Sequence, residues 1–330
     1  MGGTHSEEQE KITHLTIVLP GMAGKTYDVI IIGAGAAGLT AAIYSMRKQL
    51  QSIVVSPETG GATALSNWVE NYPGAKAMPG LELMEQFKAQ VTALGTPMAA
   101  TKVRVITPGG TFHVALENGE TISGRALIIT AGKVPRRLNV PGENKFFGRG
   151  VSTCATCDGP LFKGKPIAIV GGGNAAVEAA LELAEIAKPV YLIHRRDTFR
   201  ADEITVAKLK ASAVQLVPNS EVTAVHGERF VNGVTVRDQA GATRELAVNG
   251  LFLEIGSDTD PALVAPFATN DAHEILVDAR QRTNIPGAFA AGDVTDVAYK
   301  QTVISAGDGA LAALEAHRFL TVPGYRWPER

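Results

Sequence analysis

Two glycine-rich fingerprints, each preceded by a buried apolar run, constrain the fold of this 330-residue chain more than any other feature. The first run, Tyr27–Ile32, leads directly into Gly33-Ala34-Gly35-Ala36-Ala37-Gly38. A second run, 166–170, leads into Gly171-Gly172-Gly173-Asn174-Ala175-Ala176. A strand, a glycine-rich turn and a helix in this order form the βαβ unit that binds dinucleotides. The sequence therefore predicts an α/β protein with two Rossmann-like nucleotide-binding domains.

Each glycine of the first turn has a physical reason. Gly33 makes the tight turn, Gly35 lets the backbone approach a pyrophosphate, and Gly38 lets the helix pack on the strand. The pyrophosphate would then sit at the helix N-terminus, beside Ala36 and Ala37. A helix over 39–47 and a strand over 52–55 complete the unit. The next residues are Ser56-Pro57-Glu58, so Glu58 is either a ribose ligand or a solvated loop charge.

The second fingerprint has a basic ending. Gly171, Gly173 and Asn174 to Ala176 form the predicted phosphate turn, followed by a helix over 177–187 and a strand over 190–193. The basic residues after that strand are His194, Arg195, Arg196 and Arg200. Arginines at this point favour a 2′-phosphate through bidentate charge-assisted hydrogen bonds, which predicts NADPH. A solvated basic loop is the alternative.

Between the two fingerprints stand the only two cysteines, Cys154 and Cys157, followed by Asp158. A Cys-x-x-Cys pair can close a disulfide and reopen it to a thiolate of lowered pKa. Zinc would need four ligands, and the chain has no second pair at finger spacing, so no metal is expected. Asp158 is the nearest acid that could protonate a leaving thiolate, or else it caps the turn.

Composition excludes several classes of function. A net charge of −2 provides no electrostatic footprint for nucleic acid or an anionic membrane surface. No apolar run approaches the roughly 18 residues that a membrane span needs. The N-terminus lacks the layout of a secretory signal, so we expect the thiols to work in a reducing cytoplasm.

The connection between the motifs indicates how the domains are arranged. Strands are expected over 103–106, 111–116 and 121–130, the last of these ending just before Gly132. Late in the chain, 288–294 repeats the form of a strand, a glycine and an acid, and a helix over 305–319 follows. If this late piece returns to the first domain, the second domain is an insertion.

Together these segments resemble the low-molecular-weight thioredoxin reductases, which are two-domain FAD flavoproteins with an inserted NADPH domain. The resemblance runs from Tyr27 to Leu320 and is specific only when its motifs are taken jointly. It rests on Gly33–Gly38, Glu70–Gly74, Cys154–Gly159, Gly171–Ala176, His194–Arg200 and Ala291–Asp293.

The resemblance implies three-layer ββα domains and a homodimer that reduces a thioredoxin-like protein. An extension over 1–26 would precede an FAD domain of 27–134 and 256–330, with an NADPH domain of 135–255 inserted. Cys157 would face the flavin and Cys154 would attack the substrate disulfide. Asp293 would hold the FAD ribityl chain or a hydroxyl on its phosphate side, although capping a helix is an alternative. The implied FAD residues are Gly33, Gly35, Gly38, Gly60, Gly61, Asn71, Gly132, Gly292, Asp293, Lys300, Gln301 and Thr302.

Three departures from the family pattern bear on these expectations. Ala62 replaces a glutamine near the flavin, and Lys300 replaces an arginine, which keeps the charge but loses the guanidinium fork. The second interdomain crossing, 254–261, lacks the usual Pro-Asn-Thr. Three alternative functions would also use these motifs. They are an NADPH-dependent flavoprotein oxidase, a reductase of small disulfides or peroxide, and a redox sensor without turnover.

Overall fold

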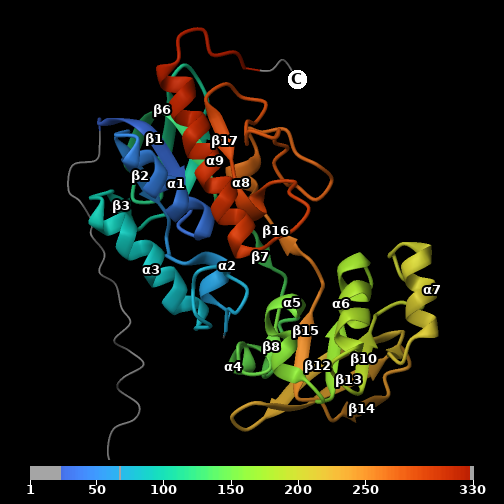
Figure 1. Ribbon diagram of the computed structural model, residues 1–330. Coiled ribbons are helices and arrows are strands. Elements are labelled where there is room, and N and C mark those ends of the chain that lie inside the picture. Colours follow the sequence, from blue (N-terminus) through green and yellow to red (C-terminus); the bar gives the residue numbers. More distant parts are fainter. Residues whose placement is uncertain (1–23, 67, 328–330) are drawn as a thin grey trace, which may run out of the picture.

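The computed structural model describes residues 24–66 and 68–327, so most of the extension over 1–26 lies outside the described residues. Figure 1 shows two bodies joined by two connecting segments. Each body has its own central sheet of mainly parallel strands. The chain therefore has the predicted α/β fold with two nucleotide-binding units.

The sheet of the first body has the order β3-β2-β1-β6-β5-β4, and β17 also pairs with β6. Strands β3, β2, β1, β6 and β17 run parallel, whereas β4 and β5 pair antiparallel as a meander on β6. The strands are β1 Thr26–Ile32, β2 Ser52–Val55, β3 Met98–Ala99, β4 Val103–Thr107, β5 Phe112–Leu116, β6 Thr121–Ile129 and β17 Ala288–Ala290.

Alternate residues of β1 enter two different cores, which explains its unbroken apolar sequence. Val29 and Ile31 pack against the helices, and Ile30 and Ile32 pack against the meander and α8. A parallel strand covered on both faces is apolar at every position. The helices are α1 Ala36–Arg47, α2 Gly61–Ala64, α3 Gly80–Ala93, α8 Pro261–Val264 and α9 Thr302–Thr321.

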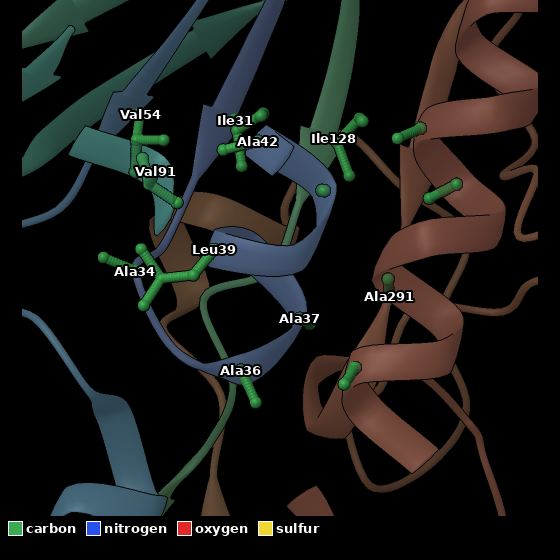
Figure 2. Close-up of a cluster of buried hydrophobic side chains, with 14 of the residues drawn as sticks. Ile31, Ala34, Ala36, Ala37, Leu39, Ala42, Val54, Val91, Ile128 and Ala291 are labelled. Atoms are coloured by element: carbon green, nitrogen blue, oxygen red, sulfur yellow. The ribbon is translucent and has the colours of Figure 1, made fainter. Parts of the chain in front are cut away.

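Helices α1 and α9 lie side by side against the sheet, as Figure 2 shows. Small side chains make this close packing possible, since Ala37, Ala41 and Ala42 are all buried. On α9, a Cβ at Gly309 would lie 2.1 Å from the carbonyl oxygen of Ala37. The two helices therefore touch through their backbones at this point, and together they hold the glycine turn at the sheet edge.

The second body repeats the plan. Its parallel sheet has the order β11-β10-β9-β15-β8, with helices on one face and the three-stranded antiparallel sheet β12-β13-β14 on the other. The strands are β8 Val151–Ser152, β9 Ile167–Val170, β10 Val190–Ile193, β11 Gln215–Val217, β12 Ser220–Gly227, β13 Val231–Asp238, β14 Thr243–Leu246 and β15 Gly250–Leu253. The helices are α4 Glu143–Phe146, α5 Ala155–Asp158, a 3-10 turn at Gly159–Phe162, α6 Asn174–Ala184 and α7 Glu203–Ala211.

The two crossings between the bodies pair with each other. Strand β7, Val134–Pro135, runs antiparallel to β16, Ser257–Asp258. Arg136 clasps the carboxylate of Asp258 with three hydrogen bonds of 2.6–3.0 Å. The two crossings thus form a short two-stranded ribbon between the bodies (Figure 1).

Helix boundaries differ from the sequence-based expectation in one consistent way. Helix α1 begins at Ala36 rather than at 39, and α6 spans Asn174–Ala184 rather than 177–187. In both turns the second half of the fingerprint already forms the first helical turn, which points its N–H groups at the sheet edge. Helix α6 ends early because its last bonds tighten to the i→i+3 pattern, as in Ile186 N–H to Leu183. Among the described residues, no helix has the length and apolarity needed to cross a membrane.

The contact between α1 and α9 can be tested with two glycines of the same helix. We expect Gly309→Ala to lower the free energy of unfolding by about 1–3 kcal/mol, because its methyl group meets the Ala37 backbone. The control Gly307→Ala has no atom within 4 Å of its new Cβ and should raise stability by about 0.5–1 kcal/mol. Chemical denaturation measures both, and equal effects would contradict the close packing.

Candidate functional site

The first glycine turn is closed by contacts that exclude side chains. A Cβ on Gly33, whose φ is +110°, would lie 2.3 Å from the Thr130 carbonyl oxygen. A Cβ on Gly38 would lie 1.9 Å from the carbonyl oxygen of Gly33. Gly35 instead faces open space, with only the Cα of Gly61 at 3.8 Å. The turn is therefore closely packed at Gly33 and Gly38 and open at Gly35, where a pyrophosphate could approach its backbone.

A second loop faces this opening. Gly60 donates its N–H to the carbonyl oxygen of Ala34 at 2.8 Å, and both Gly60 and Gly61 have left-handed φ values. The start of α9 lies nearby, because the hydroxyls of Thr63 and Thr302 are 2.8 Å apart. The structure thus brings the predicted residues of the two loops to one edge of the sheet, with Ala36 and Ala37 in the first turn of α1.

The acid end of β17 lies at the same edge. Gly292 has φ +75°, and a Cβ there would lie 3.0 Å from Ala37. The carboxylate of Asp293 accepts a hydrogen bond from Ser305 at 3.1 Å. Burial raises the pKa of Asp293, although this bond and the charge of Lys300 oppose the shift. Asp293 is thus joined to α9, and the preceding residue, Gly292, packs against α1.

Lys300 is tied down by its neighbours. Its ammonium donates to the Thr295 carbonyl at 2.5 Å and pairs with Glu274 at 3.1 Å. Glu274 also binds Lys133 at 3.0 Å, with side chains only 14% and 10% exposed. Burial alone would raise the pKa of Glu274, but hydrogen bonds from Asn270 and the two lysines hold it below its usual value.

The second glycine turn has the same base and a different lining. A Cβ on Gly171 would lie 2.3 Å from the carbonyl oxygen of Glu254, and one on Gly172 would lie 2.2 Å from the His194 ring. Gly173 has no atom within 4 Å of its would-be Cβ. Asn174 begins α6 and accepts the N–H of Asp202 at 2.8 Å. Ala175 and Ala176 follow in the first turn of α6. Of the three glycines in this cradle, Gly173 is therefore the one that faces open space.

The basic loop folds back onto this turn. His194 is buried, stacks on Phe199 at 5.3 Å and makes a 3.1 Å hydrogen bond with the Thr198 carbonyl. Arg200 donates its N–H to the carbonyl of Gly172 at 2.7 Å. The pKa of His194 is lowered, first by burial and then by the charges of Arg196, Arg195 and Arg200, against the opposing bond to Thr198. Three arginine charges therefore converge beside the cradle, and among the described residues none of them pairs with a carboxylate.

Cys154 and Cys157 are joined by a disulfide with a Cα–Cα distance of 5.3 Å. The Cys154 sulfur accepts the N–H of Cys157 at 3.2 Å, and the Ser152 hydroxyl accepts the N–H of Cys154 at 3.0 Å. Ala155 is buried in the core beneath α6 and anchors the turn. The dithiol is thus held on the end of the second sheet.

Asp158 ends α5 and is 6% exposed. Burial raises its pKa, while an interaction with the hydroxyl of Ser152 opposes the shift. One of its carboxylate oxygens, Oδ1, is buried without a hydrogen-bond partner among the described residues. A buried carboxyl with a free oxygen binds a proton more readily than a solvated one.

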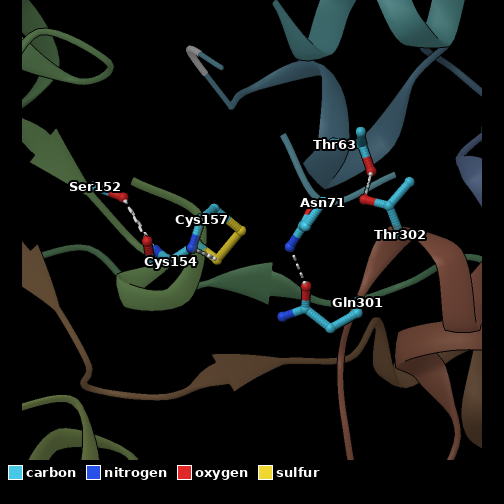
Figure 3. The surroundings of a disulfide bond; sticks show 7 residues. All are labelled: Thr63, Asn71, Ser152, Cys154, Cys157, Gln301 and Thr302. Carbon is cyan, nitrogen blue, oxygen red and sulfur yellow. Dashed lines mark hydrogen bonds between the residues drawn. A yellow bond between two sulfur atoms is a disulfide. The ribbon is translucent and has the colours of Figure 1, made fainter. Parts of the chain in front are cut away.

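The disulfide faces the first body. Figure 3 shows Cys154 and Cys157 opposite Asn71 and Gln301, which come from separate segments of that body. The Asn71 amide donates to the Gln301 side-chain oxygen at 3.2 Å. The redox turn and the first cradle therefore belong to one composite site in this arrangement of the bodies.

Two residues predicted to bind a cofactor, Glu58 and Gly132, show no side-chain contact with either cradle in the described part of the chain. Glu58 is exposed in the turn after β2, where its backbone oxygen accepts the hydroxyl of Ser56 at 2.6 Å. Gly132 has open space where a Cβ would be. Sequence reasoning missed Glu274 and Ser152. Glu274 carries no signal in the sequence because its partners, Lys133 and Lys300, are distant in the chain. Ser152 could have been found from its place two residues before Cys154.

Known proteins match this chain over most of its length. A family model described as pyridine nucleotide-disulphide oxidoreductase matches residues 27–309. The thioredoxin reductase of Mycolicibacterium smegmatis is 40% identical over 300 residues, which is 89% of this chain and 96% of that protein. The structure of thioredoxin reductase from Giardia duodenalis is 34% identical, with a TM-score of 0.86 over 90% of this chain and all of that one. The Lactococcus lactis enzyme in its FR conformation is 35% identical but has a TM-score of only 0.62 over 89% and 99%.

The open position at Gly173 provides a test of whether the second cradle binds a nucleotide. Gly173 has φ −94° and ψ −177°, which any residue adopts, so Gly173→Ala should leave the free energy of unfolding within about 0.5 kcal/mol. Its methyl group would occupy the path of a pyrophosphate, so nucleotide affinity should fall by about tenfold or more. Calorimetric titration measures this. The control Gly172→Ala meets the His194 ring and should lower stability instead; nucleotide binding unchanged in Gly173→Ala would refute the assignment.

Proposed function

Since this chain belongs to the pyridine nucleotide-disulphide oxidoreductase family and is a thioredoxin reductase, we propose how its residues share the work. Electrons pass from NADPH through FAD to the Cys154–Cys157 disulfide, and then to the disulfide of a thioredoxin-like protein. One observation carries the proposal. The disulfide belongs to the body that contains the second cradle, and it faces the first cradle across the gap between the bodies.

The first cradle fits FAD. Gly35 and Gly61 leave an opening between two loops, and the N-terminus of α1 points its N–H groups there, which suits a pyrophosphate. Asp293 supplies a carboxylate for a hydroxyl, and Asn71 with Gln301 lies on the side of the disulfide. When bound, FAD supplies two-electron chemistry between the nicotinamide and the disulfide.

The second cradle supports NADPH rather than NADH. Arg195, Arg196 and Arg200 are exposed, lack carboxylate partners among the described residues, and converge near His194. An acid there would instead accept the two ribose hydroxyls of NADH. His194 stays neutral under the arginines and holds the loop by packing on Gly172.

The redox turn supports a division of labour between the two sulfurs. Cys157 receives electrons on the side of the first body, so the sulfur of Cys154 leaves as a thiolate. Asp158, with its raised pKa, protonates that thiolate. Cys154 returns that proton to Asp158 as its sulfur attacks the partner disulfide, and one partner sulfur leaves as a thiolate. Cys157 then attacks the Cys154 sulfur of the mixed disulfide, which re-forms the Cys154–Cys157 bond and releases the partner as a dithiol that takes up the Asp158 proton and one from solvent.

A hollow beside the turn supports contact with a protein partner. A cavity of about 390 Å³ borders Ser152 and Asp158, and the exposed side chains of Leu161 and Phe230 line it. Exposed apolar groups around a cavity are typical of interaction sites. We assign the approach of the thioredoxin-like protein to this side.

The disulfide and the nicotinamide must use one flavin in turn, so we propose that the inserted domain rotates. The hinges would lie near Gly132-Lys133 and Glu254–Gly256, on either side of the β7–β16 ribbon. The two solved relatives have nearly equal identity to this chain but TM-scores of 0.86 and 0.62, which supports more than one arrangement of the bodies. We further propose that 27–134 and 256–330 form the FAD domain and that 135–255 form the NADPH domain. We also propose that the protein is a homodimer that works in a reducing cytoplasm.

Nucleotide preference follows from the arginines. We expect Arg195→Ala with Arg196→Ala to raise the Michaelis constant for NADPH by at least about tenfold, because charged hydrogen bonds to the 2′-phosphate are lost. The constant for NADH should change by less than about threefold. Arg104→Ala, an exposed arginine of β4, is the matched control. Equal use of both nucleotides by the unaltered protein would refute the assignment.

The two cysteines can be distinguished by trapping. Both Cys154→Ser and Cys157→Ser should abolish disulfide reduction, but only Cys157→Ser keeps the attacking sulfur without the one that resolves the mixed disulfide. Incubated with an oxidised thioredoxin-like protein, Cys157→Ser should form a covalent adduct that dithiothreitol releases, as seen on non-reducing gels. The double variant is the control. An adduct formed only by Cys154→Ser would reverse the two roles.

A further inference from the structure

One carboxylate of the first body joins segments that are far apart in the chain. Glu274 lies between α8 and β17, and its N–H donates to the side-chain oxygen of Asn270 at 2.9 Å. The backbone N–H of Asn270 donates in return to the Glu274 carbonyl at 3.0 Å. The next residue, Ile275, is buried and donates its N–H to the Val294 carbonyl at 2.9 Å. Glu274 is therefore held against the turn that carries Asp293.

Both oxygens of the Glu274 carboxylate are engaged. Oε2 accepts a hydrogen bond of 2.7 Å from the side-chain amide of Asn270. Oε1 interacts with two ammonium groups, Lys133 Nζ at 3.0 Å and Lys300 Nζ at 3.1 Å. One oxygen atom is thus shared by two lysines, while the bond to Asn270 fixes the orientation of the carboxylate.

The two lysines come from different parts of the first body. Lys133 lies at the first crossing, directly before β7. Lys300 lies at the opening of the first cradle, because the hydroxyl of Thr302, two residues later, is 2.8 Å from that of Thr63. The Lys300 ammonium also donates to the Thr295 carbonyl at 2.5 Å. Its position at the cradle opening is therefore set by one carboxylate oxygen and one carbonyl.

The charge of Lys300 acts on the cradle. Burial raises the pKa of Asp293, whereas the bond from Ser305 and then the charges of Lys300 and Lys133 oppose the rise. A dinucleotide in the cradle carries two negative charges on its pyrophosphate, and a nearby ammonium attracts them. Lys300 can therefore strengthen the binding of FAD only while it is held at this place.

The two ammonium groups on Oε1 repel each other, and the charge of Glu274 offsets this repulsion. In the described part of the chain, no other carboxylate forms an ion pair with either lysine. The side chain of Lys133 is 10% exposed and that of Lys300 is 31% exposed. Without the negative charge of Glu274, Lys300 is therefore the lysine that turns toward solvent.

We propose that Glu274 is a positioning residue that holds the Lys300 ammonium at the opening of the first cradle and thereby strengthens the binding of FAD. The inference rests on the FAD site of the proposed function, but not on its nucleotide preference, its thiol chemistry or its protein partner. It assigns a role to an acidic group that neither the glycine fingerprints nor the Cys-x-x-Cys motif explains.

The sign of the effect separates positioning from a simple charge effect. FAD is an anion, so removing a nearby negative charge that had no other role would tighten its binding. If Glu274 positions Lys300, Glu274→Gln weakens binding instead, because a neutral amide cannot hold two ammonium groups together. We expect FAD affinity to fall by about tenfold in Glu274→Gln and in Lys300→Met, since each loses the ammonium from the cradle.

The test uses the full-length protein, stripped of FAD and titrated with it in a calorimeter. In the double variant, Lys300→Met should add less than about threefold to the effect of Glu274→Gln, because Lys300 has already left the cradle. Lys133→Met leaves Lys300 alone on the Glu274 oxygen and should change the affinity by less than about threefold. Glu117→Gln, which removes an exposed negative charge after β5, is the matched control.

Tighter or unchanged FAD binding in Glu274→Gln would overturn the inference, and so would full additivity in the double variant. Should Glu274→Gln fail to fold, the single lysine variants decide the question. Equal losses of affinity in Lys133→Met and Lys300→Met, or no loss in Lys300→Met, overturn the inference as well. An unaltered protein that binds no FAD would contradict the proposed function, and this inference with it, so the two failures are distinguishable.

Discussion

A contact between a glycine and a neighbouring carbonyl oxygen holds each cradle in place. In the first body Gly33 lies against Thr130, which follows β6, and in the second Gly171 lies against Glu254, which follows β15. In both, a Cβ would come within 2.3 Å of the oxygen. Because no side chain fits, the strand end, the turn and the helix N-terminus are held at one sheet edge, where a pyrophosphate can bind.

The redox turn depends on the second of these edges. Ala155 anchors α5 in the core beneath α6, and Ser152 orients the backbone of Cys154. The carbonyl that closes the cradle at Gly171 belongs to Glu254, the residue after β15, and β15 also pairs with β8, which precedes the redox turn. The nucleotide turn and the dithiol thus depend on neighbouring strand ends of one sheet.

Lys300 belongs to a cluster of opposite charges in the first body. Its ammonium is held by one carboxylate, Glu274, and by the carbonyl of Thr295. Glu274 also binds Lys133, which lies next to Gly132 at the first crossing. Removing one member of such a half-buried cluster would leave a charge without its partner, which costs more than the pair itself contributes.

The sequence by itself determined the two βαβ units, the dithiol between them and the basic loop, because each depends on residues adjacent in the chain and on local backbone geometry. The predicted starts of α1 and α6 shifted because the fingerprint itself formed the first helical turn, at Ala36 and Asn174. The composite site was decided by the tertiary structure alone. Asn71 meets Gln301 across 230 positions, and Glu274 acquires its two lysine partners only through folding. Burial sets the pKa values of Asp158 and Glu254, and burial is a property of packing that no local pattern records.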